Sequence, residues 1–492
     1  MKKFMKILMV FPEVAPFSRT CSMADVGNGL PKALKDKGHD VRLITPQYRV
    51  INERKYVLRD VIRLQDIRFP MGDQDISIDV KSSFLPGSKV QVYFIDYKPF
   101  FFRDGLYAES KTGKLYPDND RRFMLFSRGV LETLIRLQWQ PDIIHCHHWQ
   151  TGSVPLFLKT LYHKAPFFRE ISCFFQIGRS NEEAYFTADC LEWMGLSPSD
   201  IRPEVKQDEK YSFIKAGIVY ADMLGLGSNP QTDNKSKASL FTRFLKERKD
   251  DVAVLPMGID DKEWNPVADD LITAKYSDED PENKKQNTKA LLEKLNLEYS
   301  PKRPVVSLIE PMVNREGLKQ VWNALEELMR LDIQFLYFGL KEEREGFPFK
   351  TAAQKYGTKM HIIDSREESM LHWLQAGTDI QLIPSISDSA CLSPLIALQY
   401  GIIPVYHADV LHFESFAPYS SKTGEGIGFR FALTNGKDMV QSLRQAVSAF
   451  SNPRDRWQLV KNCMSRDFSW SSVTRKYINC YQKCLSAMMN NR

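Results

Sequence analysis

The fold is decided by residues 5–48, which begin with MKILMV at 5–10 and end with VRLITPQY at 41–48. The first run and the start of the second are short and mostly apolar, as expected of strands buried on both faces. Between them, apolar residues from Ala24 to Leu34 recur at helical spacing, and Gly38 is placed as a helix terminator. The order strand, helix, strand predicts a βαβ unit and hence a parallel α/β sheet.

The loop at residues 11–22 follows the first of these strands. In parallel α/β sheets, ligands bind beyond the carboxyl ends of the strands. The sequence therefore predicts a binding site in this loop, and its candidate substrate-binding residues are Glu13, Arg19, Thr20, Cys21 and Ser22.

Composition narrows the class of protein. A chain of 492 residues that is 43% hydrophobic can form two or three domains, and a net charge of +6 gives no case for nucleic acid. Its eight cysteines lack paired spacing, which favours a reducing compartment. The first apolar run has about six residues, too short for a signal peptide, and no run is long enough to cross a membrane. We expect a cytoplasmic protein.

A second group of chemical residues ends a later predicted strand, at His145-Cys146-His147-His148. A cysteine and three histidines invite a metal interpretation. Consecutive residues at a strand end point in alternating directions, so at most two could share one ion. We therefore predict no metal site here.

The sequence resembles bacterial glycogen synthases and plant starch synthases from Lys6 to about Leu485. The opening stretch matches their pattern S-E-x-x-P-x-x-K-x-G-G-L-A-D-V at Glu13, Pro16 and residues 24–26. Residues 118–132 match D-N-x-x-R-F-x-x-F-S-R-x-x-L-E, and residues 145–152 match H-x-H-D-W-x-T-G except for one position.

The resemblance implies a GT-B architecture, with two Rossmann-like domains facing a central cleft. It places an N-terminal domain at residues 1–262, a nucleotide-sugar domain at 263–465, and a C-terminal helix at 466–492 that returns to the first domain. The activity it implies is retaining transfer of glucose from ADP-glucose to an α-1,4-glucan, without an obligatory metal and with no cofactor.

The departures from the family pattern fall on positions that carry its chemistry. Where the family has Lys-x-Gly-Gly-Leu, this chain has Arg19-Thr20-Cys21-Ser22-Met23, so side chains enter space that glycines leave open for phosphate. His148 replaces an Asp of the glucosyl pocket. Phe175 replaces a His that supports the donor glucose, and Gln176 beside it retains only an amide.

The second predicted domain departs in the same way. Pro311 and Glu316 stand where the family's Arg and Lys grip the donor diphosphate, while Arg315 offers partial compensation. Asp388 takes the place of a Glu that faces the transferred glucose, and Ser393 lies at the start of the next helix. By this resemblance Asp388 and His148 are the candidate catalytic residues. The further candidates for substrate binding are His147, Phe175, Gln176, Arg315 and Ser393.

Three hypotheses follow. A hydrogen bond to a charged group contributes roughly 1.5–3 kcal/mol, so the lost groups could remove on the order of 6–10 kcal/mol. The first hypothesis, which we favour, is therefore a pseudoenzyme that binds an α-glucan or a protein partner of glycogen metabolism and has little use for ADP-glucose. The second is a working glucosyltransferase that uses Arg19, Arg315 and Asp388. The third is a GT-B enzyme for another sugar donor.

Overall fold

The computed structural model describes residues 4–177, 184–227, 247–309, 315–339, 346–365, 367–384, 392–408, 417–432 and 436–490. The chain divides into two compact units. Unit 1 takes in the chain up to Pro256 and again from Val473, and unit 2 takes in Met257–Ser472. The domain limits expected at residues 262 and 465 stay predictions. Within the described residues, no helix is both long and apolar enough to cross a membrane.

Unit 1 is built around a sheet with strand order β13-β12-β8-β7-β1-β2-β6-β5-β3, in which β4 also pairs with β5. The neighbours from β13 to β6 pair in parallel, and β5 pairs antiparallel with β6, β3 and β4. The strands are β1 Lys6–Val10, β2 Asp40–Pro46, β3 Arg59–Asp60, β4 Ile67–Met71, β5 Gln74–Phe84, β6 Gln91–Asp96, β7 Ile143–His147, β8 Ser172–Ile177, β12 Met223–Leu226 and β13 Val252–Val254.

The opening βαβ unit forms as its sequence pattern predicts. Strand β1 is buried from Ile7 to Val10 and lies between β2 and β7, where Ile7 is opposite Val41 and Ile143. Helix α1 (Met23–Asp36) joins β1 to β2 and buries Leu30 and Leu34. Gly38 follows with a φ of +91°, a conformation that glycine adopts without strain.

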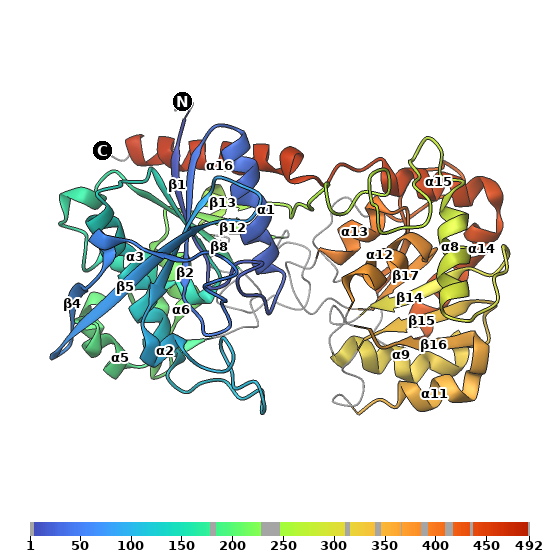
Figure 1. The fold of residues 1–492 in the computed structure, drawn as a ribbon, viewed down its shortest axis with the longest axis horizontal. Coiled ribbons are helices and arrows are strands. Elements are labelled where there is room, and N and C mark those ends of the chain that lie inside the picture. The colour runs from blue at the N-terminus through green and yellow to red at the C-terminus, as the bar shows by residue number, and fades with distance from the viewer. Residues whose placement is uncertain are drawn as a thin grey trace. The chain divides into compact units, whose positions relative to one another are not determined.

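Further helices surround the sheet of unit 1 (Figure 1). They are α2 Lys98–Phe101, α3 Asn119–Leu137, α4 Ser153–Lys159, α5 Ala188–Trp193, α6 Phe213–Tyr220 and α16 Trp470–Asn490. Three short strands, β9 Tyr185–Phe186, β10 Lys206–Gln207 and β11 Lys210–Ser212, form a separate antiparallel sheet. Helix α16 comes from the far end of the chain, yet its Tyr477 and Tyr481 are buried beside His145 of β7.

Unit 2 contains a parallel sheet with strand order β16-β15-β14-β17-β18-β19. Its strands are β14 Val305–Ile309, β15 Gln334–Phe338, β16 Met360–Ile363, β17 Ile380–Ile383, β18 Ile403–His407 and β19 Phe429–Phe431. Its helices are α8 Lys284–Lys294, α9 Arg315–Leu328, α11 Phe349–Tyr356, α12 Glu368–Gly377, α13 Ser393–Gln399, α14 Lys437–Ser451 and α15 Pro453–Met464.

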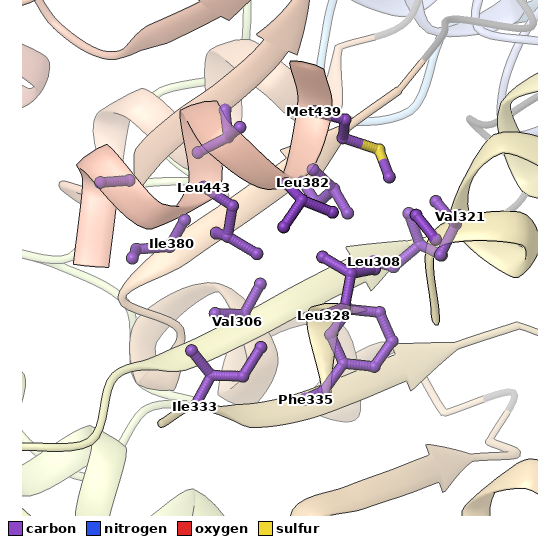
Figure 2. Packing of buried hydrophobic residues seen from close by; sticks show 14 of the residues in the cluster. Val306, Leu308, Val321, Leu328, Ile333, Phe335, Ile380, Leu382, Met439 and Leu443 are labelled. Atoms are coloured by element: carbon purple, nitrogen blue, oxygen red, sulfur yellow. The ribbon is translucent and has the colours of Figure 1, made fainter. Parts of the chain in front are cut away.

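Two apolar clusters form the core of unit 2: one packs the strands against α9, α11 and α14, and the other packs them against α8 and α12. Figure 2 shows Val306, Leu308, Ile380 and Leu382 from the strands packing toward Leu443 of α14, with Val321 of α9 in the same cluster. All of these residues have at most 5% of their surface exposed. The apolar runs that predicted buried strands therefore supply the contacts that hold the unit together.

Candidate functional site

In unit 1 the ends of three neighbouring strands bring the predicted residues to one edge of the sheet. Val10 of β1 is opposite Cys146 of β7, and His147 of β7 is opposite Gln176 of β8. Because the three strands are parallel, the segments after β1 and β7 start beside the end of β8. This edge is the place where ligands bind in parallel α/β sheets.

Glu13, in the loop after β1, is fully buried and holds that loop together. Its Oε2 accepts hydrogen bonds from the Thr20 amide at 2.8 Å and the Thr20 hydroxyl at 2.9 Å. Its Oε1 accepts from the Cys21 amide at 3.1 Å and the Cys21 thiol at 2.8 Å. Burial raises the pKa of the Glu13 carboxyl, and the donors on Cys21 and Thr20 oppose that shift. Two backbone N–H groups of the predicted binding loop therefore point at a carboxylate of the same loop.

Arg19 and Ser22 complete the loop. The Arg19 guanidinium pairs with Asp25 Oδ2 at 2.9 Å, while two thirds of its side chain is exposed to solvent. Ser22 precedes α1 and makes no side-chain capping bond to that helix. Arg19, which stands at the position of the family's Lys, is thus paired with Asp25 on the first turn of α1.

A layer of stacked rings lies at the end of β7. The His147 ring is buried; it stacks on Phe11 with 3.7 Å between centroids and lies tilted against His145 with 3.9 Å between centroids. Among the described residues, neither ring nitrogen of His147 has a hydrogen-bond partner. Burial lowers the pKa of His145 to about 3 and lowers that of His147 well below its ordinary value. Both imidazoles are therefore neutral at physiological pH and available for hydrogen bonding rather than charge pairing.

His148 follows with a strained backbone. Its φ of +65° and ψ of 172° fall in a region that glycine occupies almost alone. The side chain is buried, and the backbone N–H donates to the Gln176 carbonyl at 3.2 Å. Such a conformation costs on the order of 1–3 kcal/mol and is typical of functional sites. The structure thus marks this candidate residue in a way that the sequence did not.

Phe175 and Gln176 on β8 both lie in the interior. A Cβ built on Gly217 of α6 would meet the Phe175 ring at 2.4 Å, so the ring packs directly against that helix with none of its surface exposed. A Cβ on Gly225 of β12 would meet Gln176 Oε1 at 2.2 Å. That oxygen has no hydrogen-bond partner among the described residues. Phe175 therefore fills the space beside α6 and offers no ring face to a sugar in this structure.

In unit 2 the structure describes two of the candidates. Arg315 and the neighbouring Glu316 begin α9 and are exposed. Ser393 begins α13, and its hydroxyl accepts a hydrogen bond from Gln375 Nε2 at 3.4 Å. Asp388 and Pro311 lie outside the described residues, so the catalytic role predicted for Asp388 stays a prediction.

Three tyrosines near these residues were not predicted from the sequence. Tyr48 donates to the Pro12 carbonyl at 2.8 Å, and the half-buried Tyr107 packs edge-on against it. Burial, and next the charge of Glu13, raise the pKa of Tyr107 well above its ordinary value. Tyr481 of α16 shares a hydrogen bond of 2.8 Å with Nδ1 of His145. A helical spacing of four between Tyr477 and Tyr481 was the available signal that α16 presents a buried face.

Unit 1 also contains a cavity of about 680 Å³ lined by Arg49, Arg103, Asp104, Glu109 and Tyr116. Its lining combines cations, carboxylates and an aromatic ring. As for metals, no group of three or more His, Cys, Asp or Glu side chains in the described part of the chain could hold an ion.

Comparisons with known proteins identify the family. Residues 6–231 match the model of the starch synthase catalytic domain. The chain is 33% identical to a glycogen synthase of Chlorobaculum tepidum, covering 98% of this chain and 99% of that one. It is also 33% identical to a glycogen synthase of Moorella thermoacetica, covering 99% and 98%.

Comparison with solved structures points to the same family. The catalytic domain of starch synthase IV from Arabidopsis thaliana, bound to ADP and acarbose, superposes with a TM-score of 0.85 at 25% identity, covering 98% of this chain and 99% of that one. A sucrose-phosphate synthase from Thermosynechococcus elongatus shares the fold at 12% identity and a TM-score of 0.58. The expected GT-B fold of the α/β class is confirmed, and the chain belongs to the glycogen and starch synthase family of glycosyltransferases.

Proposed function

We propose that this glycogen synthase family member transfers glucose from ADP-glucose poorly or not at all, and that it acts by binding an α-glucan or a protein partner of glycogen metabolism. The observation that carries the proposal is the Cys21 side chain in the loop after β1: it stands at a glycine position of the family pattern, and its thiol donates to the buried Glu13 carboxylate at 2.8 Å. The amides of Thr20 and Cys21 donate to this buried carboxylate.

A donor diphosphate would have to compete with these contacts. In relatives of this family, the corresponding loop is expected to turn glycine N–H groups and a Lys toward the donor phosphates. To bind the diphosphate here, the amides of Thr20 and Cys21 would have to give up their hydrogen bonds to Glu13, each contributing about 1.5–3 kcal/mol. The diphosphate would also come close to the Glu13 carboxylate, which carries the same sign of charge. Arg19 would also have to leave Asp25, which lies 2.9 Å away.

The residues expected to contact the donor glucose also support weak donor binding. Phe175 stands where the family pattern has a His and is fully buried against α6. A phenyl ring offers no hydrogen bond to a sugar hydroxyl, and here it offers no exposed face for stacking. Without these contacts to the phosphates and the glucose, the protein would bind ADP-glucose weakly and would stabilise the transition state of glucose transfer poorly.

The α-glucan remains as the ligand that this family binds and that needs no diphosphate contact. The 680 Å³ cavity of unit 1 has the size of a small-molecule site and the mixture of charged groups and an aromatic ring that suits sugar hydroxyls. The proposal places the protein in the cytoplasm, supported by the scattered cysteines, of which the described ones are all free thiols.

The test is calorimetric titration of the full chain with ADP-glucose and, separately, with maltohexaose. The Chlorobaculum tepidum relative serves as the positive control in both titrations and in a turnover assay. We expect maltohexaose binding, no measurable ADP-glucose binding, and turnover at least 10⁴-fold below that of the relative, corresponding to the loss of about 6 kcal/mol.

Binding of ADP-glucose at micromolar to millimolar concentration would contradict the proposal and favour a rewired glucosyltransferase. In that case Arg19→Ala should weaken the binding, whereas Arg54→Ala, which removes an exposed cation elsewhere in unit 1, should leave it unchanged. Absence of maltohexaose binding would contradict the glucan part of the proposal.

A further inference from the structure

A second cavity lies in unit 2, beside α15 (Figure 1 shows this helix), and none of the residues predicted from the sequence lines it. Its volume is about 590 Å³, within the range of about 300–1,000 Å³ that is typical of small-molecule sites. One wall is the loop at residues 417–428, and the other is α15 with the residues that follow it.

The loop that forms one wall is folded back on itself. The amide of Tyr419 donates to the Gly428 carbonyl at 2.8 Å, and the amide of Ser420 donates to the Glu425 carbonyl at 2.9 Å. Gly426 has a φ of +92°, and a Cβ there would lie 2.3 Å from the Pro418 carbonyl oxygen. This close approach excludes any other residue at position 426, so the loop has one well-defined shape.

Side chains of α15 fasten the loop in place. Nδ2 of Asn462 donates to the Gly424 carbonyl at 2.8 Å and to the Gly426 carbonyl at 2.7 Å. The Tyr419 hydroxyl donates to Asp455 Oδ1 at 2.9 Å. Because the cavity is held open by these bonds, a ligand would meet a preformed site and would not have to order the loop on binding.

The chemistry of the lining indicates the class of ligand. Two guanidinium groups, Arg454 and Arg466, and two carboxylates, Glu425 and Asp455, face the cavity. Neither arginine pairs with a carboxylate in the described part of the chain. Since the charges balance, the lining favours neither an anion nor a cation. It offers both hydrogen-bond donors and acceptors, as a neutral molecule with many hydroxyl groups requires.

The remaining lining fits the same ligand. Hydroxyl groups of Ser421, Thr423 and Ser465 and the amide of Gln458 complete the walls. Each of these groups can both donate and accept, as a sugar hydroxyl does. A planar guanidinium also matches two neighbouring hydroxyls of one ring through its paired N–H groups.

We infer that this cavity of unit 2 is an auxiliary binding site for a neutral oligosaccharide. The choice of a short α-glucan as that oligosaccharide rests on the proposed function. Such a site would bind a glucan chain through side chains that are not expected to contact ADP-glucose.

The inference is tested by hydrogen exchange of the full chain, followed by mass spectrometry at increasing maltohexaose concentration. We expect maltohexaose to slow exchange in the peptides that cover 417–428 and 453–466. The maltohexaose concentration that gives half of this effect measures the affinity of the site. Glu425→Ala and Arg466→Ala should each raise that concentration about tenfold, equal to about 1.4 kcal/mol. Neither side chain makes a hydrogen bond in the described chain, so both variants should fold. Arg444→Ala, an exposed arginine of α14 outside the cavity, is the matched control and should change nothing.

The outcomes separate the two proposals. If maltohexaose binds the protein but leaves these peptides unprotected, or if the variants behave like the control, the auxiliary site is wrong while the glucan-binding function stands. If maltohexaose does not bind at all, the proposed function fails, and cellohexaose and laminarihexaose are titrated next. If neither of these sugars slows exchange in the two peptides, the proposed site is wrong. It is also wrong if inorganic phosphate or glucose 1-phosphate slows their exchange and no neutral sugar does.

Discussion

Replacing Gly217 by Ala tests whether the Phe175 ring faces α6 rather than a ligand. The added Cβ would lie 2.4 Å from Cε1 and Cζ of Phe175, whereas carbon atoms prefer separations of about 3.5–4.0 Å. The ring is fully buried and would have to move by about 1 Å or more. Overpacking of this kind costs about 1–3 kcal/mol. Ala in place of Gly in a helix gains up to about 1 kcal/mol. We therefore expect Gly217→Ala to lower the free energy of unfolding by about 0–2.5 kcal/mol.

A double-mutant cycle isolates the contact. In a Phe175→Ala background the clash disappears, so Gly217→Ala should stabilise the protein by about 0.5–1 kcal/mol. The coupling between the two positions should then be about 1–3 kcal/mol, measured by urea unfolding of unit 1. Phe174→Ala is the matched control, because its ring lies against His145 and Tyr481. Additive effects of Gly217→Ala and Phe175→Ala would refute the placement of Phe175 and revive a sugar-stacking role.

Other substitutions probe the strand ends. Tyr481→Phe leaves Nδ1 of His145 without its partner and should lower the free energy of unfolding by about 1–3 kcal/mol in urea titrations; an unchanged midpoint would contradict the bond. The folded pKa of His145, about 3, lies below its ordinary value of 6.5, so stability should be lost as pH falls from 6.5 toward 3. His145→Gln should flatten that pH dependence, and an identical slope in the variant would refute the assignment. Glu13→Gln replaces one acceptor oxygen by a donor and should cost about 2–4 kcal/mol, while Thr20→Val, which removes only the hydroxyl bond, should cost about 1 kcal/mol; equal thermal midpoints would contradict this order.

The sequence predicted the elements whose burial pattern is local. The MKILMV run becomes β1, and the helical spacing of apolar residues from Ala24 to Leu34 becomes α1 at Met23–Asp36. These elements follow from the period of apolar residues along a short stretch, which needs no knowledge of distant contacts.

The site was harder to predict because its contacts depend on how the chain returns on itself. The pattern on β8 shows that Phe174 and Phe175 face opposite sides, but not which side carries Gly217 of α6. Nothing near Glu13 in the sequence indicates that Thr20 and Cys21 donate to it. The roles of Arg19, His148, Arg315 and the other candidates stay predictions.

Helix α16 has a consequence for how the protein is made. Its Tyr481 completes the packing around His145, although 336 residues separate the two in the chain. At a synthesis rate of about 5–20 residues per second, a ribosome needs roughly 20–70 s to travel from one to the other. During that time the emerging first unit exposes Phe174 and its neighbours to the cell. Chaperone binding to the nascent chain should therefore peak before the last helix is released.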